Sequence, residues 1–161
     1  MIGADMKKID WKNLSYYDFI GFVAVTAILL FALYFGGLWY ATYDYRIQMR
    51  DQMVGMYQHL PEPLPIVSED YGVHQRWLVF YIDGVKILNK PQPENVLSEY
   101  KKALEKEGWD AEREYVRNDK NKTYGVNMRK GEFILSVSAR ENRDSINIHL
   151  IKRDWIYHMG L

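Results

Sequence analysis

The chain has 161 residues with 21 basic and 21 acidic side chains, so its formal net charge is zero. Basic and acidic residues are interleaved, which argues against nucleic-acid binding because that needs clustered positive charge. Cysteine is absent, which excludes disulfides, thiolate metal sites and a cysteine nucleophile. Removing one apolar N-terminal segment together with its flanks leaves about 100 residues, enough for one small domain with a single core.

That apolar segment runs without a charged residue from Phe19 to Ala41. A helix rises about 1.5 Å per residue and the hydrocarbon core of a bilayer is about 30 Å thick, so about 20 apolar residues cross it. The segment therefore predicts one transmembrane helix over 19–41, preceded by a tail over 1–18. It is longer than the core of a cleaved signal peptide and lacks a small-residue cleavage pattern, so we expect an uncleaved signal anchor in the lipid bilayer.

The flanking charges predict an orientation. Lys7, Lys8 and Lys12 precede the apolar segment, whereas Arg46 and Arg50 follow it. The excess of basic residues on the first side favours a cytoplasmic N-terminus. We therefore expect a single-pass protein of the cell membrane with its C-terminal domain outside the cytoplasm, in the periplasm or at the cell surface.

The segment 42–60 has no helix breaker except Gly55 and predicts a juxtamembrane helix that continues the span. A stripe of apolar residues at spacings of four, three and four follows one side of this helix: Met49, Met53, Met56 and Leu60. Two interpretations stay open. The stripe packs on the protein's own domain or at the membrane surface, or it docks a helix of a partner. We favour the partner, because an apolar stripe on an extended helix needs cover.

Three prolines, Pro61, Pro63 and Pro65, end this helix, because proline removes a backbone donor and disfavours helix at the residue before it. The stretch 61–75 is therefore predicted to be a stiff, extended linker.

An α+β domain is predicted over 76–152. The run Arg76 to Ile82 is rich in strand formers, and Asp83-Gly84 is a turn signal, so a hairpin or a bulged strand is expected here. From Pro93 to Gly108 apolar residues recur at helical spacing.

Strict alternation follows the helix, with a weaker strand over 110–117. The alternation predicts strands that place nine residues on one face: Tyr124, Val126, Met128, Phe133, Leu135, Val137, Ile146, Ile148 and Leu150. The short polar turns between them favour antiparallel pairing. We expect one helix to cover the apolar face of a largely antiparallel sheet.

The string PENVLSEYKKALEKEGW, Pro93 to Trp109, is preceded by GVKIL and followed by amphipathic strands. On these marks, the region from Asp83 to Lys152 resembles a recurrent bacterial module of secreted, lipoprotein or membrane-anchored proteins of unknown function. The resemblance implies a fold and an extracytoplasmic setting, and it implies no catalytic residues. The order of tail, span, helix and small domain is more loosely similar to bitopic scaffold subunits of pilus and secretion machines.

The sequence carries no catalytic or metal-binding motif. His59, His74, His149 and His158 do not stand at metal-ligand spacings. Ser136 lacks the glycines of a nucleophile elbow, and no glycine-rich loop follows a strand to hold phosphate. We therefore expect no enzyme activity, no metal and no cofactor.

Two further surfaces are candidates for binding. The second face of the sheet is predicted to be mostly polar, with these residues pointing outward: Thr123, Asn127, Arg129, Ser136, Ser138, Asn147 and His149, beside Ile134 and Ile151. The C-terminal tail 153–161 contains apolar residues, Trp155 and Tyr157 among them, that need cover. We expect the tail to dock on its own domain, with a neighbouring protein or the bilayer interface as alternatives.

These observations predict a non-enzymatic, single-span accessory or scaffold subunit that contacts other membrane proteins or copies of itself. The contact residues are predicted to be Met49, Met53, Met56, Leu60, Trp155 and Tyr157. The alternative is a membrane-tethered ligand-binding or sensory domain that uses the polar sheet face. A membrane-anchored hydrolase that uses His149 or Ser136 ranks third.

Overall fold

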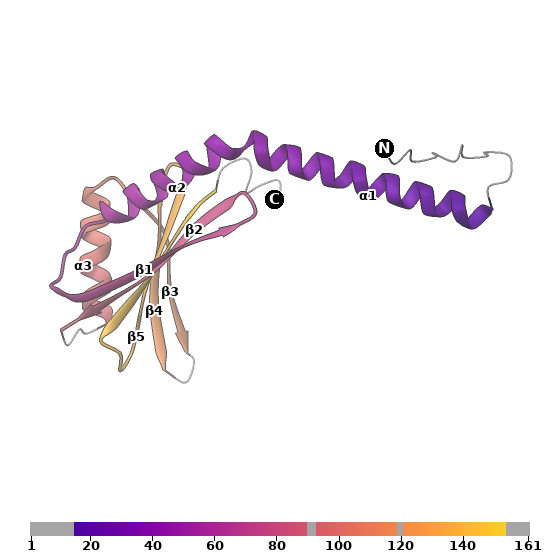
Figure 1. Cartoon of the computed structure of the whole chain (residues 1–161). Helices are drawn as coiled ribbons and strands as arrows, with labels where there is room; N and C mark the ends of the chain where they lie inside the picture. The colour runs from indigo at the N-terminus through magenta and orange to yellow at the C-terminus, as the bar shows by residue number, and fades with distance from the viewer. Residues whose placement is uncertain (1–14, 90–92, 119–120, 154–161) are drawn as a thin grey trace. The chain divides into compact units, whose positions relative to one another are not determined.

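The computed structural model describes residues 15–89, 93–118 and 121–153 (Figure 1). The chain divides into two compact units, Met1–Asp44 and Tyr45–Leu161. The predicted tails lie largely outside the described residues. This applies to most of the segment 1–18, and to Trp155 and Tyr157 at the other end of the chain.

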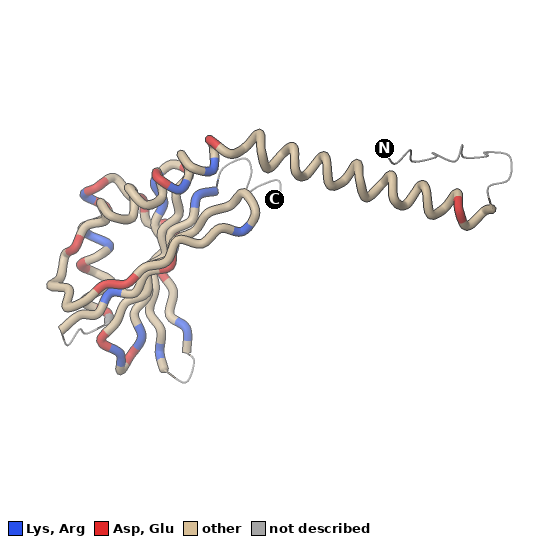
Figure 2. The backbone as a smooth tube through the Cα atoms, in the orientation of Figure 1, with Lys and Arg blue, Asp and Glu red and all other residues tan. Residues whose placement is uncertain are grey.

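The first unit contains the apolar helix α1, Tyr16–Ala41. A capping box begins it, in which the N–H of Tyr17 donates to the Ser15 hydroxyl and the N–H of Ser15 donates to the Asp18 carboxylate at 3.2 Å. Figure 2 shows no charged residue along α1 beyond Asp18. None of its residues is buried, and among the described helices α1 is long and apolar enough to cross a membrane.

The second unit is built on one antiparallel sheet with the strand order β1-β2-β6-β5-β4-β3. The strands are β1 (Ile66–Arg76), β2 (Val79–Leu88), β3 (Asp110–Asn118), β4 (Lys122–Lys130), β5 (Phe133–Arg140) and β6 (Ser145–Lys152). Helix α2 (Tyr43–Gln58) and helix α3 (Pro93–Lys106) contribute to a single core on one face of this sheet (Figure 1). The predicted α+β fold with an antiparallel sheet is confirmed, but two helices and not the one expected pack on the sheet.

The predicted alternation of β4, β5 and β6 is confirmed residue by residue. Seven of the nine residues named for the inner face are buried in the core, and Tyr124 and Phe133 are partly buried against it. Helix α3 covers β4 and β5 and contributes Val96, Tyr100 and Leu104 to the core, as its apolar spacing requires. The chain turns after α3 at Gly108, where φ is +81°, a conformation that glycine adopts without a Cβ clash.

The methionine stripe of α2 packs on the protein's own domain. Met49, Met53 and Leu60 are 3%, 0% and 7% exposed, and all belong to the core that α2 and α3 share. Met56 is partly buried against the same core. The favoured interpretation, a partner helix on this stripe, is therefore corrected, because a helical stripe shows that cover is needed but does not show what provides it.

The predicted linker over 61–75 is shorter in the structure. Strand β1 begins at Ile66 and pairs with β2 from Ile66 opposite Leu88 to Arg76 opposite Val79. Most β1 side chains are exposed, so the strand has no alternating apolar pattern that could have revealed it. It is nevertheless ordered by the backbone ladder, because its partner β2 is anchored in the core.

The predicted turn at Asp83-Gly84 lies inside β2, and the hairpin turns instead at Trp77 and Leu78. Trp77 takes the positive φ of 55° that such a tight turn demands. Gly84 has a different role: a Cβ built there would lie 2.0 Å from the Tyr57 hydroxyl oxygen. The glycine therefore makes room for the buried Tyr57 ring of α2.

Candidate functional site

Within the second unit, α2 and α3 both lie on one face of the sheet, and neither of these described helices covers the second face (Figure 1). We call it the open face. The strand register places these residues together on it: Asp70, His74, Tyr81, Asp83, Val85, Ile87, Asn127, Ser136, Ser138, Asn147 and His149. They are exposed or half-buried. The outward direction predicted for Asn127, Ser136, Ser138, Asn147 and His149 therefore agrees with the structure.

A histidine cluster lies on the half of the open face next to the β1 edge, formed by His74, Tyr81, Asp83 and His149 from β1, β2 and β6. His149 Nδ1 lies 2.7 Å from Asp83 Oδ1, and His74 Nε2 lies 3.8 Å from Asp83 Oδ2. The Tyr81 ring stacks on His74 with centroids 5.1 Å apart and lies 5.6 Å from the His149 ring. The Asp83 carboxylate thus lies between the imidazoles of His74 and His149, and the Tyr81 ring contacts both imidazoles.

The register explains why the cluster forms. Asp83 is opposite Gly72 on β1 and opposite His149 on β6, whereas His74 is opposite Tyr81. Gly72 has no side chain in the space that the His74 ring uses, since a Cβ there would lie 2.8 Å from His74 Nε2. The glycine therefore allows His74 to lean along its own strand toward Asp83.

The cluster lacks one requirement of acyl transfer. Ser136 is directly opposite His149, so Ser136, His149 and Asp83 stand in a row across three strands. However, acyl transfer also needs backbone N–H groups aimed at an oxyanion, and the amides of these central strands are used in the sheet ladder. The described residues contain no group of three His, Asp or Glu side chains arranged to hold a metal ion.

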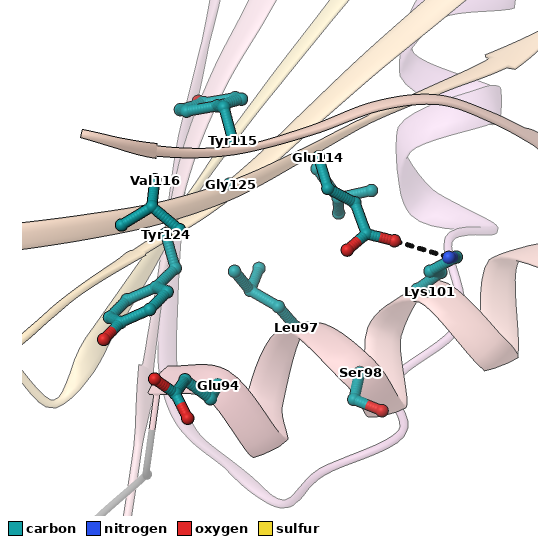
Figure 3. Close-up of a pocket in the computed structure, with 10 residues that line it drawn as sticks. Glu94, Leu97, Ser98, Lys101, Glu114, Tyr115, Val116, Tyr124 and Gly125 are labelled. Atoms are coloured by element: carbon teal, nitrogen blue, oxygen red, sulfur yellow. Dashed lines mark hydrogen bonds and ion pairs between the residues drawn. The ribbon is translucent and has the colours of Figure 1, made fainter.

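A groove of about 460 Å³ lies on the helix-bearing side, between α3 and the β3–β4 hairpin (Figure 3). Leu97, Val116 and Tyr124 form its apolar part. Lys101 on α3 donates a hydrogen bond to Glu114 on β3 at one end, and this bond raises the pKa of Lys101. The Lys101–Glu114 ion pair connects α3 to the edge strand β3 at one end of the groove. The groove is therefore the space between two elements that this ion pair holds together, and it needs no ligand to account for it.

A buried lysine lies on the helix-bearing face of β2. Lys86 is 2% exposed, and its Nζ lies 2.9 Å from Glu62 Oε1 and 3.3 Å from Glu69 Oε1. Burial raises the pKa of Tyr57 and of Tyr100 above the ordinary range of tyrosine, and the neighbouring Glu69 adds to both shifts. Both phenols therefore stay neutral, and Lys86 is the cation that pairs with the carboxylates of Glu62 and Glu69. Glu62 belongs to the proline-rich segment, so its ion pair with Lys86 fixes that segment against the domain.

Four of the predicted contact residues lie on α2 or just after it. Met49, Met53 and Leu60 lie in the core, whereas Met56 lines a shallow hollow with Gln52, His59 and Phe133. The sequence does not predict the histidine cluster as a unit, because His74, Asp83 and His149 are far apart along the chain and share no motif spacing. Comparison with protein-family models, curated proteins and solved structures gives no match to this chain. The candidate site therefore has to be judged on its geometry.

Proposed function

We propose that this chain is a membrane-anchored accessory subunit that binds a partner protein through the open face of its sheet. The observation that carries the proposal is the asymmetry of the domain. One face of the sheet is covered by the chain's own helices, whereas the other presents a histidine cluster and two exposed aliphatic residues. Val85 and Ile87 are 41% and 43% exposed on that face.

The composition of the open face supports a protein partner. Protein interfaces combine an apolar part with hydrogen-bonding groups around it, and they are enriched in tyrosine. The open face has the aliphatic pair on β2 and, beside it, Tyr81, Asn147 and the two histidines. A broad sheet surface also suits a protein better than a small molecule, which is usually enclosed in a cavity.

The apolar helix α1 supports the membrane part of the proposal. It carries no buried residue, so lipid is the cover that its length and composition suit. We propose the orientation that the basic flanks favour, with the N-terminus in the cytoplasm and the domain outside it. In this arrangement the open face meets its partner on the outer side of the membrane.

A second candidate is a membrane-tethered domain that binds a small ligand at the histidine cluster. The observation that favours it is the Tyr81 ring, which stacks on His74 and lies close to Asp83 and His149. An aromatic surface next to a carboxylate and two imidazoles can stack on a ligand ring and hydrogen-bond to its hydroxyl or amino groups.

The test is photo-crosslinking in cells that express the full chain. A photoreactive amino acid at Asn147, on the open face, is expected to crosslink to a partner protein in a band of defined mass. The matched control is the same amino acid at Lys102, whose side chain is 63% exposed on α3. Crosslinks of equal yield from both positions, or none from Asn147, would contradict the proposal. If Val85→Arg is introduced as well and the crosslinked band from position 147 is lost, the partner contact includes Val85, which lies opposite Asn147.

A further inference from the structure

The sheet has two edge strands, β1 and β3, each paired on one side only within the described chain. An edge strand offers a row of backbone donors and acceptors to another strand, and proteins block such pairing with charges and bulges. Strand β3 has both devices: five of its nine residues are charged, and a register shift interrupts it between Ala111 and Arg113. Strand β1 also has a register shift, between Ile66 and Ser68, but only three of its 11 residues are charged, Glu69, Asp70 and Arg76. It is therefore less protected than β3 over the regular stretch from Ser68 to Arg76.

The charges of β1 are complementary to those of a second β1. If two copies pair antiparallel about a two-fold axis through Val73, Asp70 of each strand stands opposite Arg76 of the other. The intervening pairs, Tyr71 with Gln75 and Gly72 with His74, contain no like charges. Opposite charges that face each other across antiparallel strands stabilise the pairing, and the symmetry makes this contact twice.

Both charged side chains are available for this contact. Asp70 and Arg76 are exposed, and neither has an ion-pair partner among the residues that the structure describes. Their spacing of six residues about Val73 places both on the same face of the sheet.

We propose that two copies of this chain associate edge to edge through β1, antiparallel and centred on Val73, which joins their sheets into one. This inference does not depend on the proposed function, because the contact involves β1 at the margin of the open face and leaves the part of that face formed by β2, β6 and β5 uncovered. The self-association contact would thus lie at the β1 edge, a position that the sequence alone does not indicate.

The test is the mass of the full chain in detergent, measured by light scattering over a dilution series. Wild type is expected to be a dimer that dissociates on dilution. Asp70→Arg and Arg76→Asp each place like charges opposite each other, and each is expected to weaken the dimer about tenfold or more. The double variant Asp70→Arg/Arg76→Asp restores opposite charges and is expected to return the dimer to near wild-type strength.

Arg113→Asp, on the other edge strand, is the matched control and is expected to leave the dimer unchanged. A monomeric wild type, single variants that dimerise as wild type does, or a double variant as weak as the singles would each overturn the proposal. A dimer lost with Arg113→Asp would also overturn it, since the contact would then lie at β3. Circular dichroism of each variant confirms folding. Crosslinking from Asn147 reports separately on the open face, so failure of one proposal is distinguishable from failure of the other.

Discussion

Replacing Lys86 with alanine is expected to lower the free energy of unfolding of the domain by about 2–4 kcal/mol. The ammonium group is buried between Glu62 and Glu69 and lies 5.8 Å from the centre of the Tyr57 ring. Removing it leaves two carboxylates facing each other without a cation and leaves a space in the core. The estimate is below the full cost of breaking a buried ion pair, because both glutamates are partly exposed to solvent.

Two variants separate the causes of this loss, both measured by urea unfolding of the full chain in the same detergent. Lys86→Met keeps the apolar stem and removes the charge, so it is expected to lose less stability than Lys86→Ala. Lys102→Ala removes an exposed lysine that pairs with Glu99 on α3, and it is expected to change stability little. An unfolding midpoint for Lys86→Ala equal to that of wild type would show that the buried lysine does not hold the domain together.

Replacing Gly84 with alanine is expected to cost about 1–3 kcal/mol, the range for overpacking a well-packed core. The new Cβ would lie 2.0 Å from the Tyr57 hydroxyl oxygen and 2.7 Å from its ring carbon Cζ. The ring cannot easily move away, because Tyr57 is buried between β2 and the Tyr71 ring, whose centroid is 4.8 Å away. Either α2 or β2 must therefore shift.

The same substitution elsewhere in the chain provides the control. Gly55 lies in the last turn of α2 with no atom within 4 Å of an added Cβ, so Gly55→Ala is expected to stabilise the domain by up to about 1 kcal/mol. Combining Gly84→Ala with Tyr57→Leu, which removes the atoms that clash, is expected to cost less than the sum of the two single changes. Additive losses in thermal unfolding would count against a clash between these two residues.

The parts of the fold that could be predicted are those with a strong local pattern. The alternation of β4, β5 and β6 and the helical spacing of Val96, Tyr100 and Leu104 each indicate an element and its buried face without knowledge of the rest. Strand β1 could not be predicted in this way because it is an edge strand, exposed over most of its length. Its order depends on pairing with β2, which is a tertiary property.

The candidate site was harder to predict than the fold because it depends on register. His149 and Asp83 are 66 positions apart in sequence, and only the pairing of β2 with β6 brings them opposite each other. Lys86 offered a weak signal, since it stands on the side of β2 where Ile82 and Leu88 are buried. A lysine at such a position indicates a buried partner, but the sequence does not show that Glu62 and Glu69 supply it.

The spacing of the methionine stripe correctly predicts one helical face. The surface that covers this face was predicted wrongly, because it is the chain's own domain and not a partner helix. Met49 and Met53 are fully covered by the domain, so α2 is part of the folded unit and not a free connector. For this reason our proposal assigns the partner contact to the open face of the sheet. The open face is uncovered because α2 and α3 both pack on the other face of the sheet, which the sequence does not show.

The most direct test of the central claim is the native mass of the full chain extracted gently from membranes at its endogenous level, with identification of the proteins that co-purify. We expect the chain in the membrane fraction, in an assembly of defined stoichiometry that is larger than a dimer and contains at least one other protein. A chain recovered outside the membrane fraction, or a monomer or dimer with no other protein, would contradict the account.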